Sequence, residues 1–169
     1  MKKKVINISI IIFFIIGLSL LLYPTVANQW NTYRQSKLMS NYEEQIEEMQ
    51  SSGEVDMEAE WEKAEAYNEA LLPTILPDSF AIAEAKQEED KTYTSSLNLM
   101  GDGMMGKVVI PKIDVNLPVF HYTTKEVLEN GVGHLEGSSL PIGGESSHSV
   151  LSAHRGLPSA SLFTDLDRL

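Results

Sequence analysis

The chain has 169 residues, no cysteine and a formal net charge of −11 at pH 7. Without cysteine it can form neither a disulfide nor a thiolate metal site. Most of the charge lies between Asn28 and Met105, a stretch with 17 acidic and 5 basic residues. This acidity argues against a nucleic-acid partner and against adsorption to an anionic lipid surface, and solvated helical faces account for most of the acids.

The first 24 residues have the pattern of a membrane anchor. Three lysines at positions 2–4 precede Val5–Leu22, an uncharged run rich in Ile, Leu and Phe. A helix needs roughly 20 apolar residues to span a bilayer, and the positive-inside tendency puts the lysines in the cytoplasm. We therefore predict a cytoplasmic tip and transmembrane anchor over residues 1–24, with the bulk of the chain outside the cytoplasm. A cleaved signal peptide is the alternative, because the small residues Thr25–Ala27 follow; its apolar region is usually shorter, about 7–15 residues.

Residues 25–72 are rich in helix-forming residues and lack proline. Ser51–Gly53 is a stop signal, and Asp56 is suited to cap a second helix. Apolar residues recur at spacings of three and four in the first helix, at Met39, Tyr42, Ile46 and Met49. The pattern predicts a helical hairpin of two antiparallel helices whose apolar stripes pack on each other.

Residues 73–105 read as a lid or linker. Pro73 and Pro77 end the helix and hold the chain extended. The following Ala81–Leu99 carries several acids and few large apolar side chains, which predicts a weakly ordered linker or a mobile flap.

Residues 106–169 change to a β-like pattern. Three short apolar runs, Lys107–Ile110, Leu117–His121 and His148–Ala153, are separated by glycine and proline turns. Such runs predict a barrel or sandwich rather than a parallel sheet. The region is short for a closed barrel with a firm core, so we expect the chain to be the front part of a longer domain.

The candidate chemistry of this region lies in its histidines. They are His121, His134, His148 and His154. Their spacing does not match a helical metal site, and Gly131, Gly133 and Gly137 miss the dinucleotide-binding spacing, so we read these glycines as turns and expect no metal and no cofactor.

His154 stands at the end of a predicted strand, before a sharp turn at Arg155–Pro158. An imidazole on such a rim reaches solvent and exchanges protons near neutral pH. From the residues alone, a structural or merely exposed histidine stays open, because no serine elbow motif accompanies it.

Three segments of the β-like region resemble sortases: GKVVIPKIDVNLPVFH at residues 106–121, GVGHLEGSSLPIGG at 131–144, and SAHRGLP with LFTDLD within 152–167. Together with the anchor and the long helical region, they resemble class C sortases, the pilin-polymerising transpeptidases of Gram-positive bacteria. The resemblance implies an α+β fold, in which a transmembrane helix and helical hairpin precede the first strands of an incomplete sortase-type β-barrel. A sortase of another class, with a single anchor, is the weaker alternative.

The resemblance also implies a function. Class C sortases are membrane-anchored cysteine transpeptidases that cleave LPxTG-like sorting signals and join pilin subunits through a lysine during pilus assembly, so pilins and the membrane would be the partners. His154 looks like the family's catalytic histidine. The family's cysteine and arginine lie on later strands, so we expect this chain to be a fragment without its nucleophile and inactive alone.

Asp78 and Phe80 resemble the family's lid, with Ser79 where proline is expected; a polar linker is the alternative. A non-catalytic, membrane-tethered interaction protein, whose acidic helices bind a partner, remains the alternative function.

Overall fold

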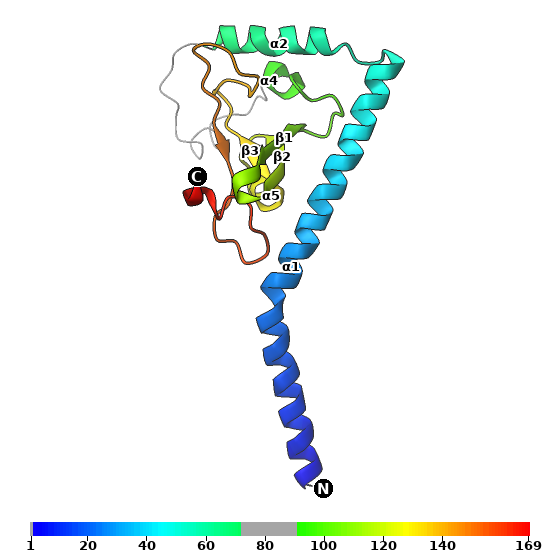
Figure 1. Ribbon diagram of the computed structural model, residues 1–169, viewed down its shortest axis with the longest axis vertical. Coiled ribbons are helices and arrows are strands. Elements are labelled where there is room, and N and C mark those ends of the chain that lie inside the picture. The colour runs from blue at the N-terminus through cyan, green and yellow to red at the C-terminus, as the bar shows by residue number, and fades with distance from the viewer. Residues whose placement is uncertain (1, 72–90) are drawn as a thin grey trace.

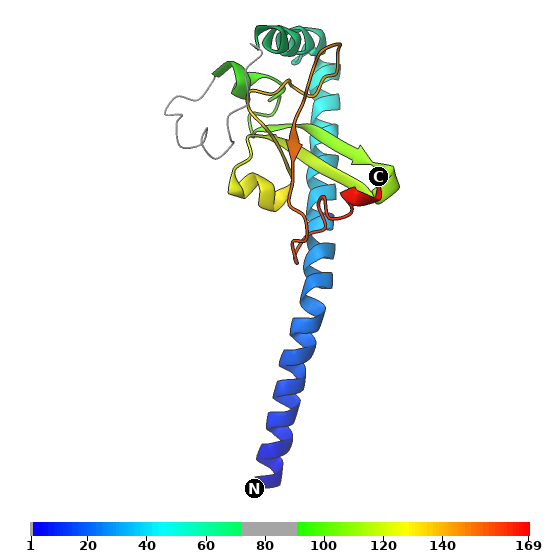
Figure 2. The ribbon, with the colours of Figure 1, turned by 90° about the vertical axis from the view of Figure 1, so that its left-hand side faces the viewer.

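The computed structural model describes residues 2–71 and 91–169. It begins with α1 (Lys2–Ser52), one helix of 51 residues with Pro24 inside it. The predicted anchor and the first predicted helix are therefore continuous. The N-terminal part of α1 projects alone from the molecule, whereas its C-terminal part runs beside the folded region (Figures 1 and 2).

The helix break occurs where the sequence predicts it. α1 ends at Ser52, and α2 (Met57–Ala70) follows with Asp56 as its N-cap. The Asp56 carboxylate accepts hydrogen bonds from the backbone N–H groups of Glu58 and Ala59, at 3.0 and 3.2 Å. These bonds satisfy donors that the first turn of a helix leaves without partners.

The prediction that the two helices pack on each other in an antiparallel arrangement is wrong. Figure 1 shows α2 leaving the end of α1 sideways and crossing the top of the folded region. The reason lies in its buried side chains, because Ala64 and Tyr67 of α2 join the common core with Tyr93 instead of pairing with α1.

Four short strands form one open sheet in the order β1-β2-β3-β4. They are β1 (Met104–Ile110), β2 (Val115–His121), β3 (Val132–His134) and β4 (Leu151–Ser152). The pairs β1–β2 and β3–β4 are antiparallel, as is typical of a barrel made of hairpins, but β2 and β3 are parallel. A parallel pair needs a crossover, and α5 (Lys125–Asn130), which the sequence pattern did not predict, provides it. Two short 3₁₀ helices are also present: η1 (Pro111–Ile113) lies between β1 and β2, and η2 (Leu166–Arg168) lies near the C-terminus.

Two of the three glycines read as turns have another role. Gly133 lies in β3, where an added Cβ would come within 2.4 Å of the Tyr122 carbonyl oxygen. At Gly131, directly before β3, a Cβ would come within 2.8 Å of the Pro118 carbonyl oxygen. Both glycines allow a close approach of two backbones. Gly137, with a φ of 85°, does lie in a turn.

The last part of the predicted linker belongs to the core. Residues 91–95 form α4 (Lys91–Ser95), and Tyr93 is completely buried. Its neighbours in the core come from α2, the sheet and the C-terminal loops: Ala64, Tyr67, Met105, Val115, Leu117, Val119, Val132, Leu140, Ala160, Leu162 and Phe163. A segment that is otherwise polar is thus tied to the core through a buried aromatic side chain.

One face of α1 is turned toward the folded region. From Asn28 onward, its partly or fully buried residues recur every three or four positions, at Asn28, Asn31, Gln35, Met39, Tyr42, Ile46 and Met49, and Ala27 beside them is partly buried as well. The predicted stripe from Met39 to Met49 is therefore real, but α1 packs beside β2 rather than against α2. At this interface the Lys107 ammonium donates to the Glu43 carboxylate.

Candidate active site

His154 lies two residues beyond β4, at the edge of the sheet, and is partly exposed. Its carbonyl oxygen accepts a hydrogen bond from the Phe163 N–H at 3.1 Å, so the backbone at this position is held. Within the part of the chain that the structure describes, the His154 imidazole makes no hydrogen bond or ion pair. A ring of this kind, fixed at its backbone and open at both nitrogens, is suited to exchange protons with a bound molecule.

The segment that follows His154 folds back on itself. The Gly156 N–H donates to the Thr164 hydroxyl at 3.0 Å, and Arg155 pairs with Asp167 at 3.0 Å. Both members of the ion pair are more than half exposed, at 64% and 58%, so its contribution to stability is small. This loop is therefore stabilised mainly by its backbone hydrogen bonds and by the burial of Leu162 and Phe163.

The same segment is also bound to α1. The Asn31 amide donates to the Ser159 carbonyl oxygen at 2.7 Å, and the Asn28 amide oxygen accepts from the Ser161 N–H at 2.7 Å. The Ser161 hydroxyl adds a bond to the same oxygen at 3.0 Å. The loop after His154 therefore rests on the first turns of α1 beyond the apolar run.

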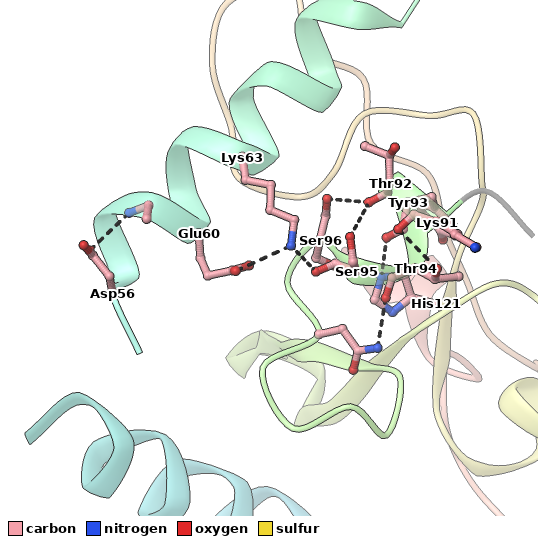
Figure 3. Close-up of polar contacts among 12 residues, drawn as sticks. Asp56, Glu60, Lys63, Lys91, Thr92, Tyr93, Thr94, Ser95, Ser96 and His121 are labelled. Carbon is pink, nitrogen blue, oxygen red and sulfur yellow. Dashed lines mark hydrogen bonds and ion pairs between the residues drawn. The ribbon is translucent and has the colours of Figure 1, made fainter. Parts of the chain in front are cut away.

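Two other histidines are structural. His121 and His134 lie side by side at the ends of the parallel strands β2 and β3, and both are buried. The His121 ring contacts the carbonyl oxygens of Gly103, Tyr93 and Ser96 at 2.9–3.0 Å. Figure 3 shows it close to the residues of α4. Its role is to hold α4 on the sheet rather than to meet a substrate.

His134 is joined to Tyr93. Its Nδ1 lies 2.9 Å from the Tyr93 hydroxyl, which also accepts from the Tyr122 N–H at 3.1 Å, and its Nε2 lies 2.8 Å from the Ser139 carbonyl oxygen. Because a carbonyl only accepts, Nε2 carries the proton and Nδ1 accepts from Tyr93. Burial lowers the pKa of His134 and raises that of the Tyr93 hydroxyl, so both groups stay neutral near pH 7.

The structure brings no other predicted residue to His154 among the residues that it describes. Asp78 and Phe80, the predicted lid, are outside the residues that the structure describes. His148 lies exposed in the loop before β4. Across residues 2–71 and 91–169, no group of three or more His, Cys, Asp or Glu side chains is arranged to hold a metal ion.

Sequence reasoning missed Tyr93, Asn28 and Asn31. Tyr93 is the one aromatic residue between positions 81 and 99, and that isolation was the available signal. For the two asparagines, the signal is their continuation of the spacing of Met39 and Tyr42 toward the apolar run of α1.

Comparison with known proteins agrees with this architecture. Residues 108–169 match the family model described as a sortase domain. No curated protein sequence matches the chain.

Solved structures of sortases C resemble the chain over most of its length. Sortase C of Streptococcus pneumoniae is 34% identical with a TM-score of 0.65, and the match covers 79% of this chain and 63% of that one. Sortase C1 of Streptococcus agalactiae is 37% identical with a TM-score of 0.62, covering 79% and 65%. Sortase C-1 of Actinomyces oris is 37% identical with a TM-score of 0.59, covering 68% and 62%. The chain thus spans less than two thirds of the length of each of these structures, and the predicted resemblance to class C sortases is confirmed.

Proposed function

We propose that the chain is part of a membrane-anchored class C sortase that cleaves LPxTG-like sorting signals and joins pilin subunits through a lysine, because residues 108–169 match the family model of a sortase domain. The structural neighbour from Streptococcus pneumoniae is described with a pilin substrate specificity, which supports the substrate class. The observation that carries the proposal is the position of His154, which has a partly exposed imidazole on the rim after β4 within the sortase domain.

In this mechanism a cysteine thiolate attacks the threonine carbonyl of the sorting signal, and the Thr–Gly bond breaks as His154 gives a proton to the departing glycine amine. The product is a thioester on the enzyme. The pilin lysine amine then attacks that thioester, His154 takes up the proton of the amine, and the carbon–sulfur bond breaks to restore the thiolate. One difficult amide exchange becomes two easier steps. The 169 residues contain no cysteine, so we assign them the histidine of this site and not its nucleophile.

The anchor is the second part of the proposal. Among the residues that the structure describes, α1 is the one helix long and apolar enough to cross a membrane. Its apolar side chains are exposed, with Phe13 and Leu21 both at 74%, so the helix is not the buried core helix of a soluble domain. Residues 25–27, where a signal peptide would be cleaved, lie inside the continuous helix. These features support a retained anchor, with the bulk of the chain outside the cytoplasm.

A chimera tests the proposed activity. The chain is followed by the part of Streptococcus pneumoniae sortase C that it does not match, and the protein is given an LPxTG-type peptide and a lysine-containing acceptor. We expect peptide release and transfer, and a loss of about 10³-fold or more in the His154→Ala variant, because the groups of such a site act as a unit. His148→Ala is the matched control, since this histidine is exposed in the loop before β4 and should be dispensable.

Retention of transfer within tenfold in His154→Ala would remove His154 from the catalytic role. A folded chimera without any peptide release would instead favour the non-catalytic, membrane-tethered interaction protein. The 169-residue chain alone should show no cleavage above background, and clear turnover by it would contradict the assignment of the nucleophile to another part of the enzyme.

A further inference from the structure

The face of α1 that meets the folded region changes character along the helix. Its positions farther from the apolar run are mostly apolar, as at Met39 and Ile46, whereas Asn28, Asn31 and Gln35, which with Ala27 lie nearest that run, all carry amides. All three amides bond the backbone of the folded region, and Gln35 donates to the Asn130 carbonyl oxygen at 2.9 Å. Because amides bury little apolar area, their contribution at these positions is to orient the backbone that they bond.

Asn28 and Asn31 use opposite halves of the same side-chain group. Ser161 presents an N–H, which only donates, so the Asn28 atom at 2.7 Å must be its carbonyl oxygen. Ser159 presents a carbonyl oxygen, which only accepts, so the Asn31 atom at 2.7 Å must be its amide nitrogen. The two contacts bond two backbone groups of one loop and so fix the position of the loop along the helix.

The loop that they hold is the one that begins at His154. The chain runs from His154 through the turn at Gly156 to Ser159 and Ser161, and then returns to His154 through the bond from the Phe163 N–H to the His154 carbonyl oxygen at 3.1 Å. A displacement of Ser159 or Ser161 is therefore transmitted to the backbone of His154 from both sides.

We propose that Asn28 and Asn31 are positioning residues that bind the loop 155–161 to α1 and so fix the orientation of His154. The proposal rests on the proposed function of His154 only for its catalytic consequence. At 1.5 Å per residue, Asn28 and Asn31 lie about 9 and 14 Å along the helix from Leu22, the end of the apolar run. Because α1 is one helix, these bonds connect the histidine rim directly to the anchor.

Carboxylate substitutions test the proposal because an aspartate accepts but cannot donate. In Asn28→Asp the carboxylate still accepts from the Ser161 N–H and hydroxyl, whereas in Asn31→Asp an oxygen faces the Ser159 carbonyl oxygen and the bond is lost. The full 169-residue chain, placed in lipid nanodiscs, is studied by amide hydrogen exchange and by NMR of the His154 ring. Asn41→Asp is the matched control, as Asn41 lies exposed on the same helix.

We expect exchange of the Ser161 amide to rise by about tenfold in Asn28→Ala and to stay within about twofold of the wild type in Asn28→Asp, the range that one hydrogen bond supports. Asn31→Asp should loosen the loop as much as Asn31→Ala does. The His154 ring signals should broaden in Asn28→Ala and Asn31→Asp but not in Asn28→Asp or Asn41→Asp.

An equal response to Asn28→Asp and Asn31→Asp would overturn the proposal, because a general effect of charge or helix propensity does not distinguish donor from acceptor. Unchanged exchange and line widths in all variants would overturn it as well. Neither readout involves peptide cleavage, so failure here leaves the catalytic role of His154 standing, and failure of the chimera assay leaves the positioning contacts standing.

Discussion

Tyr93→Phe is expected to destabilise the folded region strongly although it removes a single oxygen atom. The Tyr93 hydroxyl lies 2.9 Å from His134 Nδ1 and accepts from the Tyr122 N–H at 3.1 Å, while the side chain itself is completely buried. Phenylalanine fills the same space, so little packing is lost. Each buried polar group left without a partner costs about 1–3 kcal/mol, and with two groups affected we expect a loss of about 2–6 kcal/mol. This is a large part of the roughly 5–15 kcal/mol that stabilises a typical domain.

The measurement is pulse proteolysis of the full chain in nanodiscs across a urea gradient, which gives the free energy of unfolding of the part outside the membrane. Tyr33→Phe is the matched control, because Tyr33 lies on α1 with 59% of its surface exposed, and it should change the free energy by less than about 0.5 kcal/mol. A loss below about 0.5 kcal/mol in Tyr93→Phe would refute the argument that α4 is held by this hydroxyl. A loss of the same size in the control would show that the assay does not report on the core.

Three further outcomes follow from single contacts. Burial lowers the pKa of His134 below the ordinary 6.5 of the unfolded chain, so the unfolded chain binds more protons than the folded one as the pH falls. The free energy of unfolding should therefore be greatest above pH 6.5 and decline below it, and the decline should be weaker in His134→Gln. Gly133→Ala should cost more than about 2 kcal/mol by urea unfolding, because its Cβ would lie 2.4 Å from a backbone oxygen, whereas Gly17→Ala, with nothing within 4 Å, should be neutral. Asp56→Ala should lower stability by about 1 kcal/mol and raise hydrogen exchange in the first turn of α2 without changing the sheet, and an unchanged first turn would contradict the capping assignment.

The parts of the fold that the sequence predicted depend on local chemistry. The stop at Ser51–Gly53, the cap at Asp56 and the first two strands are each encoded by a few adjacent residues, and the structure confirms them. A cap or a turn satisfies its own backbone groups, so no distant partner is needed to recognise it.

The parts that were wrong depend on distant partners. Tyr93 stands in a polar stretch, and its importance comes from His121 and His134, which follow 28 and 41 positions later. Gly133 has a neutral local pattern, and the close approach of Tyr122 appears only when β3 pairs with β2. Local propensity carries no information about either contact, which is why a linker and a turn were the natural interpretations.

The direction of α2 also depends on distant partners that a local pattern does not reveal. The apolar stripe of α1 was correctly recognised, but periodicity gives a buried face and not its partner. Two amphipathic helices joined by a short turn satisfy that pattern equally well by packing on each other or by packing separately on a sheet. Here the burial of Ala64 and Tyr67 in the common core favours the second arrangement, and Asn68 supports it, because its amide bonds both backbone groups of Leu140 in the loop after β3, at 2.6 and 3.3 Å.

A related argument applies to the end of α1 that carries the proposed membrane span. An apolar residue at position 28 or 31 would add apolar surface close to that span and define its end less clearly, because the bilayer offers the same apolar surroundings as the protein core. Asparagine avoids that ambiguity, since it favours neither the bilayer nor an apolar interface without a partner. The backbone of Ser159 and Ser161 supplies the partner, so these two side chains, which follow the proposed membrane span along α1, begin the contact with the histidine loop.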